Sequence, residues 1–433
     1  MSYIPTDLIE VFAWGRFVGA VVLDPQTNVY AFEYDESWIE RGEDLSPLHL
    51  PRRRGVFEFP ELSRETYYGL PALSADALPD RFGNALVTAW MAEQGVDASQ
   101  ISPLDRLAYA SDRTMGALSF APPARPQRAT ISMVQVADLV AAARAQIEGS
   151  LEDDDVHDAL TQLITVGSTA GGARAKAVIA YNRATGQIRS GQVSAPAGYE
   201  QWLLKLDGVG DPSHGGSVVL RATQPYGRVE YAYYLMARAA GIAMNDSQLL
   251  LEGPRAHFLT KRFDRSAAGE RIHVQTLCAL AHLDYNLART HSYGSYFLTA
   301  RRLGLGPDDF QQIFRRAAFN IFGVNRDDHA KNFSFLLPES GTWQLAPAYD
   351  VTHSNWVSEW TQAHQMSVNG RFVGITLDDL RAMGDLYEVP AIEGTLRDVA
   401  AAIAQWRTFA ATAGVDEMTV SKIADDHEQF RPR

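Results

Sequence analysis

The chain has 433 residues, enough for two or three domains with a sizeable core. Its 39 Lys and Arg against 52 Asp and Glu give a formal net charge of −13. This balance argues against a broad nucleic-acid-binding face, because phosphate contacts need clustered Lys and Arg. A hydrophobic content of 46% with 21% charged residues excludes disordered and fibrous proteins. The single cysteine, Cys278, excludes an intrachain disulfide and a cysteine-rich zinc site.

The N-terminal segment MSYIPTDLIEVFAWG predicts a cytoplasmic protein. Asp7 and Glu10 stand where a signal peptide would carry basic residues and then an apolar run. We also expect no membrane-spanning segment, because the chain lacks an uninterrupted apolar run of about 18 residues. A single cysteine fits a reducing compartment.

The first third of the chain predicts a small β-rich domain. Residues 8–34 predict a β-hairpin, since LIEVFAWGRFVGAVVL and VYAFEY are rich in β-branched and aromatic residues and flank the turn sequence DPQTN. Residues 71–96 predict a helix that begins after Pro79 and Asp80. The proline-rich stretch 121–130 then indicates a linker.

The rest of the chain predicts a mixed lobe followed by a helical lobe. Ser132 and Gln135 form a capping-box pattern, and residues 227–241 have helical spacing. Strand-like segments lie at 175–182, 200–207 and 256–263. Near the end, a core-facing helical stripe is formed by Leu396, Val399, Ile403 and Trp406. The predicted class is α+β, with a β-rich domain at 1–122, a mixed α/β lobe at 130–265 and a helical lobe at 266–433.

The stretch FNIFGVNRDDHAKNFSFLL (319–337) places ionisable side chains between two apolar runs. Asp327 and Asn332 match the spacing of the kinase catalytic loop H-R-D-x-x-x-x-N. Phosphoryl transfer needs a carboxylate to accept the proton of a substrate hydroxyl and a neutral oxygen ligand for Mg²⁺ nearby. Asp350, in LAPAYDV, follows an apolar strand where a kinase has its main metal-binding Asp, although the Phe and Gly of the D-F-G motif are absent.

Two other interpretations of this cluster stay open. The first is a polar turn followed by an acidic residue at a strand end. The second is a metallohydrolase that uses Asp327, Asp328 and His329 as metal ligands.

Upstream segments fit a nucleotide site in the order found in kinases. In VGSTAGGARAKA (166–177), Gly171 and Gly172 let backbone N–H groups approach phosphates, although a flexible turn is the plainer interpretation. Lys205 lies in the apolar strand WLLKL, where a kinase pairs a lysine with phosphates and with a helix Glu, here Glu230. The alternative is a lysine on the solvent face of an edge strand. In AHFLTKRFDR (256–265), a strand end could bind adenine through its backbone, with Phe263 lining the pocket.

These segments resemble the HipA family, the serine/threonine kinase toxins of bacterial HipBA toxin–antitoxin modules. The resemblance rests on STAGGARAK, LLKL, KRFDR, DDHAKNFS and LAPAYDV, and it covers nearly the whole chain. It implies a two-lobed protein-kinase-like fold behind a small β-rich N-terminal domain. It also implies ATP and Mg²⁺ as cofactors.

Carried over residue by residue, the resemblance implies a role for each motif position. Asp327 would be the catalytic base, and Asn332 and Asp350 would hold Mg²⁺. Glu230 would form the ion pair with Lys205. The nucleotide would be bound by Gly171, Gly172, Lys205, Phe263, His329 and Lys331. Autophosphorylation would fall on a hydroxyl of the Gly-rich loop, either Thr169 or Ser168.

The resemblance further implies a partner and a substrate. The partner would be a small dimeric helix-turn-helix antitoxin (HipB-like), and DNA would be contacted only through it. The substrate would be a translation protein of the aminoacyl-tRNA synthetase class. We interpret the basic run Arg52, Arg53 and Arg54 as a solvated loop rather than a DNA contact. Two alternatives remain: a small-molecule kinase of similar fold, and a catalytically silent module that binds the antitoxin.

Overall fold

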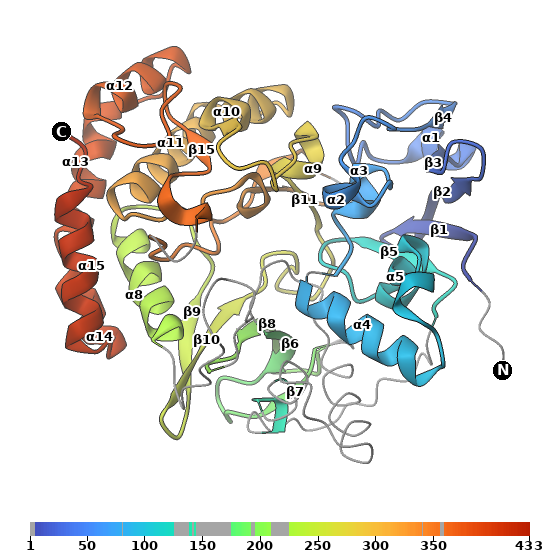
Figure 1. Cartoon of the computed structure of the whole chain (residues 1–433), viewed down its shortest axis with the longest axis horizontal. Coiled ribbons are helices and arrows are strands. Elements are labelled where there is room, and N and C mark those ends of the chain that lie inside the picture. Colours follow the sequence, from blue (N-terminus) through green and yellow to red (C-terminus); the bar gives the residue numbers. More distant parts are fainter. Residues whose placement is uncertain are drawn as a thin grey trace. The chain divides into compact units, whose positions relative to one another are not determined.

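The computed structural model describes residues 5–79, 81–124, 138–140, 143, 175–191, 195–208, 225–339, 341–355 and 359–433. The chain divides into two compact units. Unit 1 comprises Met1–Asp211, Leu259–Gln275 and Leu337–Thr342, and unit 2 comprises Pro212–Phe258, Thr276–Leu336 and Trp343–Arg433. Helices and strands occur in both units (Figure 1), which confirms the α+β class. The domain boundaries at 122, 130 and 265 stay predictions.

Unit 1 begins with an antiparallel sheet of order β4-β3-β2-β1-β5. Its strands are β1 (Leu8–Ala13), β2 (Arg16–Asp24), β3 (Val29–Tyr34), β4 (Val56–Phe57) and β5 (Leu118–Ala121). The predicted hairpin over 8–34 is wrong in one respect, since its first segment is two strands. Trp14 and Gly15 both have positive φ (51° and 77°), as a tight two-residue hairpin turn requires, and they separate β1 from β2.

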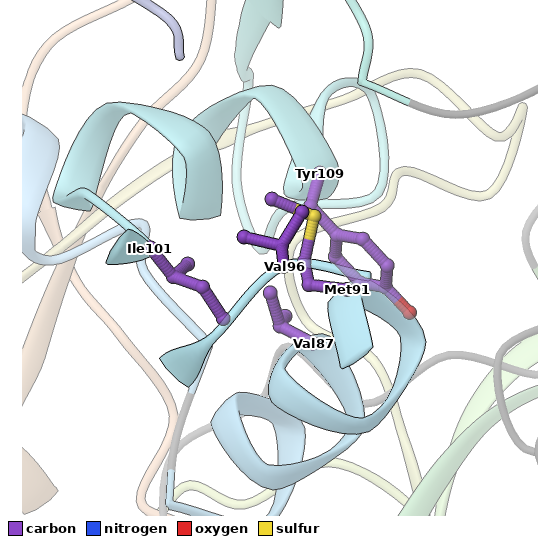
Figure 2. Close-up of a cluster of buried hydrophobic side chains, with 5 residues drawn as sticks. All are labelled: Val87, Met91, Val96, Ile101 and Tyr109. Carbon is purple, nitrogen blue, oxygen red and sulfur yellow. The ribbon is translucent and has the colours of Figure 1, made fainter. Parts of the chain in front are cut away.

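Two of the helices of unit 1, α4 and α5, pack through a small apolar cluster. They are α1 (Glu36–Arg41), α2 (Arg64–Tyr67), α3 (Ala72–Ala75), α4 (Arg81–Glu93), the 3₁₀ turn η1 (Ala98–Gln100) and α5 (Pro103–Ala110). Helix α4 confirms most of the helix predicted over 71–96. Figure 2 shows the cluster between α4 and α5, formed by Val87, Met91, Val96, Ile101 and Tyr109. Its members are at most 8% exposed, so this contact removes apolar surface from water.

A second sheet of unit 1 contains β6 (Lys176–Tyr181), β7 (Ile188–Ser190) and β8 (Glu200–Lys205), and the end of β10 (Arg255–Lys261) belongs to the same unit. These strands belong to a five-stranded sheet of order β7-β6-β8-β10-β9, in which β9 is Ser247–Glu252, so β8 has a neighbour on each side. Trp202 and Leu204 are fully buried and alternate with partly exposed residues. The three strands predicted around 175–182, 200–207 and 256–263 are confirmed. Strand β11 (His273–Thr276) begins at the end of this unit.

Unit 2 is mainly helical. It contains α8 (Tyr226–Ala239), α9 (Leu277–Ala281), α10 (Tyr293–Arg302), α11 (Pro307–Phe322), α12 (Leu377–Leu386), α13 (Ile392–Ile403), α14 (Trp406–Ala413) and α15 (Glu417–Gln429). Helix α11 is central, since Phe314, Ala317 and Phe319 have no exposed surface. Helices α13 and α14 pack against α8, as Figure 1 shows. The predicted stripe from Leu396 to Trp406 is buried, but it spans the end of α13 and the start of α14.

The described strands of unit 2 are short, and the loop that carries the polar cluster leads into one of them, β13. They are β9 (Ser247–Glu252), β12 (His291–Ser292), β13 (Ser334–Leu337), β14 (Gln344–Leu345) and β15 (Met366–Ser367), with 3₁₀ turns η2 (Ala330–Asn332) and η3 (Trp360–Gln362). Strands β13 and β14 pair antiparallel. None of the helices in the described residues is both long and apolar enough to span a bilayer.

Candidate active site

The loop between α11 and β13 carries the polar cluster that the sequence singles out. Phe319, before the loop, and Phe335, after it, have no exposed surface, so both ends of the loop are anchored in the core of unit 2. Val324 adopts positive φ (53°) and turns the chain out of α11. The backbone N–H of Arg326 then donates to Ser354 O at 3.0 Å. The loop is therefore held at its ends and along its length.

Asp327 lies at the exposed side of this loop. Its Oδ1 accepts a hydrogen bond from the indole Nε1 of Trp360 at 2.9 Å, and His329 Nε2 lies 3.8 Å from the same oxygen. Although 46% of its side-chain surface is accessible, desolvation by surrounding protein atoms raises the pKa of the carboxyl. The nearby Asp350 carboxylate raises that pKa further, whereas His329 and the Trp360 hydrogen bond lower it.

Asn332 and Asp350 meet beside Asp327. Asn332 Nδ2 donates to the backbone oxygen of Asp327 at 2.8 Å, so its Oδ1 is the amide atom left to bind a cation. Tyr349 donates through its hydroxyl to Lys331 O at 2.8 Å and thereby holds the neighbouring Asp350 against the loop. Asn332 and Asp350 both line a cavity of about 20 Å³. The other lining residues are Ile242, Arg316, Asn320, Asn325, Asp328, Phe333, Ala348, Tyr349 and Val351.

The donor set at this cavity fits Mg²⁺. Mg²⁺ prefers oxygen ligands and is usually held by one or two protein carboxylates together with substrate phosphates and water. An amide oxygen from Asn332 and a carboxylate from Asp350 supply such a set. Asp350 has a positive φ of 56°, a conformation that Asp and Asn adopt more readily than most residues.

Asp328 has a structural role instead. It is 1% exposed, and its Oδ2 accepts from the Tyr293 hydroxyl at 2.7 Å and lies 3.0 Å from His364 Nδ1. Its Oδ1 accepts from the backbone N–H of Gln365 at 2.7 Å. Both carboxylate oxygens thus have protein partners. No group of three or more His, Cys, Asp or Glu in the described part of the chain could hold a metal. Because both oxygens of Asp328 already have protein partners, the geometry disfavours a metallohydrolase site that uses Asp328 as a ligand.

His329 and Lys331 lie in the same loop as Asp327. His329 Nδ1 accepts from the backbone N–H of Lys331 at 3.3 Å, and its ring lies 5.4 Å from that of Tyr285. Lys331 Nζ lies 5.0 Å from the same tyrosine ring, at the range of a cation–π contact. The structure thus gathers Asp327, His329, Lys331, Asn332 and Asp350 in one place. Their contacts with nucleotide stay predictions.

The predicted nucleotide-site residues of unit 1 occupy a different sheet. Lys205 is half-buried on β8, and because β8 lies between two strands, the edge-strand alternative is wrong. The β6–β8 register places Lys176, which is 3% exposed, directly opposite Lys205. Phe263 is half-buried just beyond β10, and its adenine contact stays a prediction.

The other predicted residues are distributed as follows. Glu230 is 2% exposed on α8 in unit 2, and its pairing with Lys205 stays a prediction. Ser168, Thr169, Gly171 and Gly172 lie outside the described residues, as do the capping-box residues Ser132 and Gln135.

Comparison with known proteins assigns the family. Residues 9–121 match the HipA N-terminal domain, and residues 168–430 match the HipA-like C-terminal domain. The chain belongs to the HipA family. The HipA chain in the Shewanella oneidensis MR-1 complex of HipA, HipB and operator DNA is 16% identical, with a TM-score of 0.64 over 98% of this chain and 95% of that one. That match confirms a HipA-like fold.

Two further relatives are kinases by name. The Sinorhizobium fredii protein Y4dM, a candidate kinase, is 28% identical over 190 residues, which are 38% of this chain and 45% of that protein. This chain therefore aligns with less than half of that relative's length. The Helicobacter pylori proinflammatory kinase CtkA is 11% identical and covers 59% of this chain and 94% of its own at a TM-score of 0.33, which is too low to support a shared fold.

In this HipA-family chain, the KRFDR segment forms a buried ion cluster that the sequence does not reveal. Asp264 has no exposed surface and accepts from Arg262 at 2.8 and 2.6 Å, from Arg265 at 2.7 Å and from the backbone N–H of Gly116 at 2.7 Å. Arg271 donates to Gly116 O at 2.8 Å. The motif thus joins the segment around Gly116 to the end of β10 within unit 1. In the sequence, this cluster could have been suspected only from the charged residues of KRFDR, which follow directly after the apolar strand AHFLT.

Proposed function

We propose that this chain is an ATP- and Mg²⁺-dependent serine/threonine protein kinase and the toxin of a HipBA-like toxin–antitoxin pair. The observation that carries the proposal is that an accessible carboxylate, Asp327, lies beside Asn332 and Asp350, whose oxygen donors line one cavity. Membership of the HipA family supports the same activity.

The proposed reaction assigns the proton to Asp327. A substrate hydroxyl attacks the γ-phosphorus of ATP, a new P–O bond forms, and the bond from that phosphorus to the β–γ bridging oxygen breaks to release ADP. Asp327 accepts the hydroxyl proton, and its raised pKa makes it a better base than an ordinary surface carboxylate. Asn332 and Asp350 would hold Mg²⁺, which neutralises phosphate charge when bound.

The proposed ATP site is supported by the lysines of unit 1. Lys176 and Lys205, opposed on β6 and β8, would contact phosphates, and Phe263 would line the adenine pocket. Gly171 and Gly172 would approach the phosphates, and Thr169 or Ser168 would accept a regulatory phosphate. A dianion in that loop would repel the phosphates of ATP and turn the kinase off.

We propose a HipB-like helix-turn-helix antitoxin as partner and a protein of the aminoacyl-tRNA synthetase class as substrate. The Shewanella oneidensis complex contains HipA, HipB and operator DNA, and this supports an equivalent partner here. The net charge of −13 favours DNA contact through the antitoxin. The basic run does not favour direct DNA contact, because Arg52 donates to Ile39 O and Arg54 pairs with Glu36.

Phosphate transfer from γ-labelled ATP tests the proposed function. The full chain is incubated with labelled ATP, with Mg²⁺ or with EDTA, and with cell extract, alongside an Asp327→Asn variant. We expect Mg²⁺-dependent label in the chain itself and in an extract protein, and none with the variant. Label confined to small molecules would favour a metabolite kinase. A folded wild-type chain that transfers no label would overturn the proposal in favour of a silent antitoxin-binding module.

A further inference from the structure

The contact between Trp360 and Asp327 assigns a residue that the family motifs do not mark. We infer that Trp360 is a positioning residue, whose indole N–H holds Asp327 Oδ1 so that Oδ2 is left to accept the proton of the substrate hydroxyl. This inference rests on the proposed function. Its basis is the 2.9 Å hydrogen bond from Trp360 Nε1 to Asp327 Oδ1. The two residues are 33 positions apart and belong to different loops of unit 2.

Trp360 is itself held by the residues on either side of Asp327. Arg326 donates to Gln362 O at 3.1 Å, and Asp328 Oδ1 accepts from the backbone N–H of Gln365 at 2.7 Å. Gln365 Nε2 in turn donates to Trp360 O at 2.5 Å. The loop that carries the carboxylate therefore also anchors the segment that carries the indole.

The exposure of Asp327 indicates that the Trp360 indole orients this carboxylate rather than blocking access to it. A carboxylate with 46% of its side-chain surface accessible still has room to meet a substrate hydroxyl while the indole holds one oxygen. A carboxylate can rotate about its last side-chain bond, and a hydrogen bond to one oxygen fixes that rotation. Catalysis depends on such alignment, because small misplacements of a reacting group reduce the rate strongly. His329 is less suited to this role, since its Nε2 lies 3.8 Å away, beyond hydrogen-bond range.

The matched test deletes one indole N–H at the site and one elsewhere in unit 2. Trp360→Phe keeps an aromatic ring but removes the donor. Trp406→Phe is the control. Trp406 Nε1 donates to Val420 O at 3.0 Å, and both residues belong to the C-terminal helices rather than to the loop that carries Asp327. Each variant of the full chain is measured for kcat, for the KM of ATP and for the midpoint of thermal unfolding. The assay follows transfer of label from ATP.

If Trp360 positions Asp327, its loss should lower kcat without changing the KM for ATP. We expect Trp360→Phe to lower kcat about tenfold or more, since a hydrogen bond to a charged group contributes enough for such a change. The KM for ATP should stay within about twofold of wild type, and the unfolding midpoint should not fall below that of Trp406→Phe. The control should keep its kcat per folded molecule.

Three outcomes would overturn the inference while leaving the proposed function in place. They are an unchanged kcat, a raised kcat, which would make Trp360 an occluding residue, and a loss explained by a higher KM for ATP. If the wild-type chain itself transfers no label, the proposed function fails, and the inference fails with it.

Discussion

Asp327 and Asp328 are adjacent in the chain, yet their carboxylates face opposite environments. Asp328 points into the core of unit 2, where Tyr293, His364 and the backbone of Gln365 surround it. Asp327 points outward and accepts from Trp360. One residue of the pair thus supports the loop and the other remains available for chemistry.

This contrast predicts opposite effects of the same isosteric change. Asp327→Asn should lower the rate of phosphate transfer by about 10²–10⁴-fold, because an amide cannot accept the hydroxyl proton. Its free energy of unfolding should change little. Asp328→Asn should lower the free energy of unfolding by roughly 1–3 kcal/mol, since a buried acceptor oxygen is replaced by an NH₂ group that faces donors. Urea unfolding and labelled-ATP assays on both variants check this, and equal losses of stability would contradict it.

Asp350 offers a test of the metal site that leaves the backbone undisturbed. Asn tolerates the left-handed conformation that Asp350 adopts, so Asp350→Asn should keep the fold while weakening the metal site. We expect the Mg²⁺ concentration for half-maximal activity to rise about tenfold or more, because a charged oxygen ligand becomes neutral. Asp350→Ala serves as the comparison variant, because it removes the same ligand but also strains the backbone, since alanine adopts the left-handed conformation less readily than asparagine. A Mg²⁺ titration unchanged in Asp350→Asn would argue that Asp350 is no ligand.

Local features of the fold and site could be predicted from the sequence, and distant partners could not. The spacing of Asp327 and Asn332 is enough to bring them together, because the amide reaches the backbone oxygen five residues earlier. Trp360 and Tyr293 lie 33 and 35 residues from their carboxylate partners, and no local pattern encodes such contacts.

The strands also show that local structure could be predicted from the sequence whereas the pairing of distant residues could not. Their apolar patterns predict β6 and β8, but the Lys176–Lys205 pairing depends on register, which the intervening segment hides. The turn at Trp14 was missed because a tryptophan in the left-handed conformation is an uncommon turn residue.

The ion cluster at Asp264 should dominate the stability of unit 1. Asp264→Asn would leave Arg262 and Arg265 buried without a full counter-charge, and breaking a buried ion pair in this way costs roughly 3–5 kcal/mol. The control is Glu393→Gln, which removes an exposed ion pair with Arg381 and should change stability little. Urea unfolding measures both. Similar stability of the two variants would show that the cluster contributes no more than a surface pair.

His427 predicts a defined response to acid in unit 2. Its Nε2 lies 2.8 Å from the Tyr233 hydroxyl, which donates to Gly323 O at 2.6 Å. Burial lowers the pKa of His427 to about 4, with the nearby His353 contributing. In the unfolded chain the same group has a pKa of about 6.5. Between these two values the unfolded state binds the proton and the folded state does not, so the free energy of unfolding falls as pH falls from about 6.5 to 4.

The size of this loss is on the order of 3 kcal/mol by pH 4, because each pKa unit corresponds to about 1.4 kcal/mol. His427→Gln keeps an N–H donor toward Tyr233 but cannot titrate. Urea unfolding at a series of pH values from 9 to 4 (set about half a unit apart) should therefore give a shallower slope for this variant than for wild type between about pH 6.5 and 4. Above about pH 8 the two slopes should coincide, since the wild-type histidine is then almost fully deprotonated in both the folded and the unfolded state. Parallel slopes throughout would mean that His427 is protonated in the folded chain as readily as in the unfolded one.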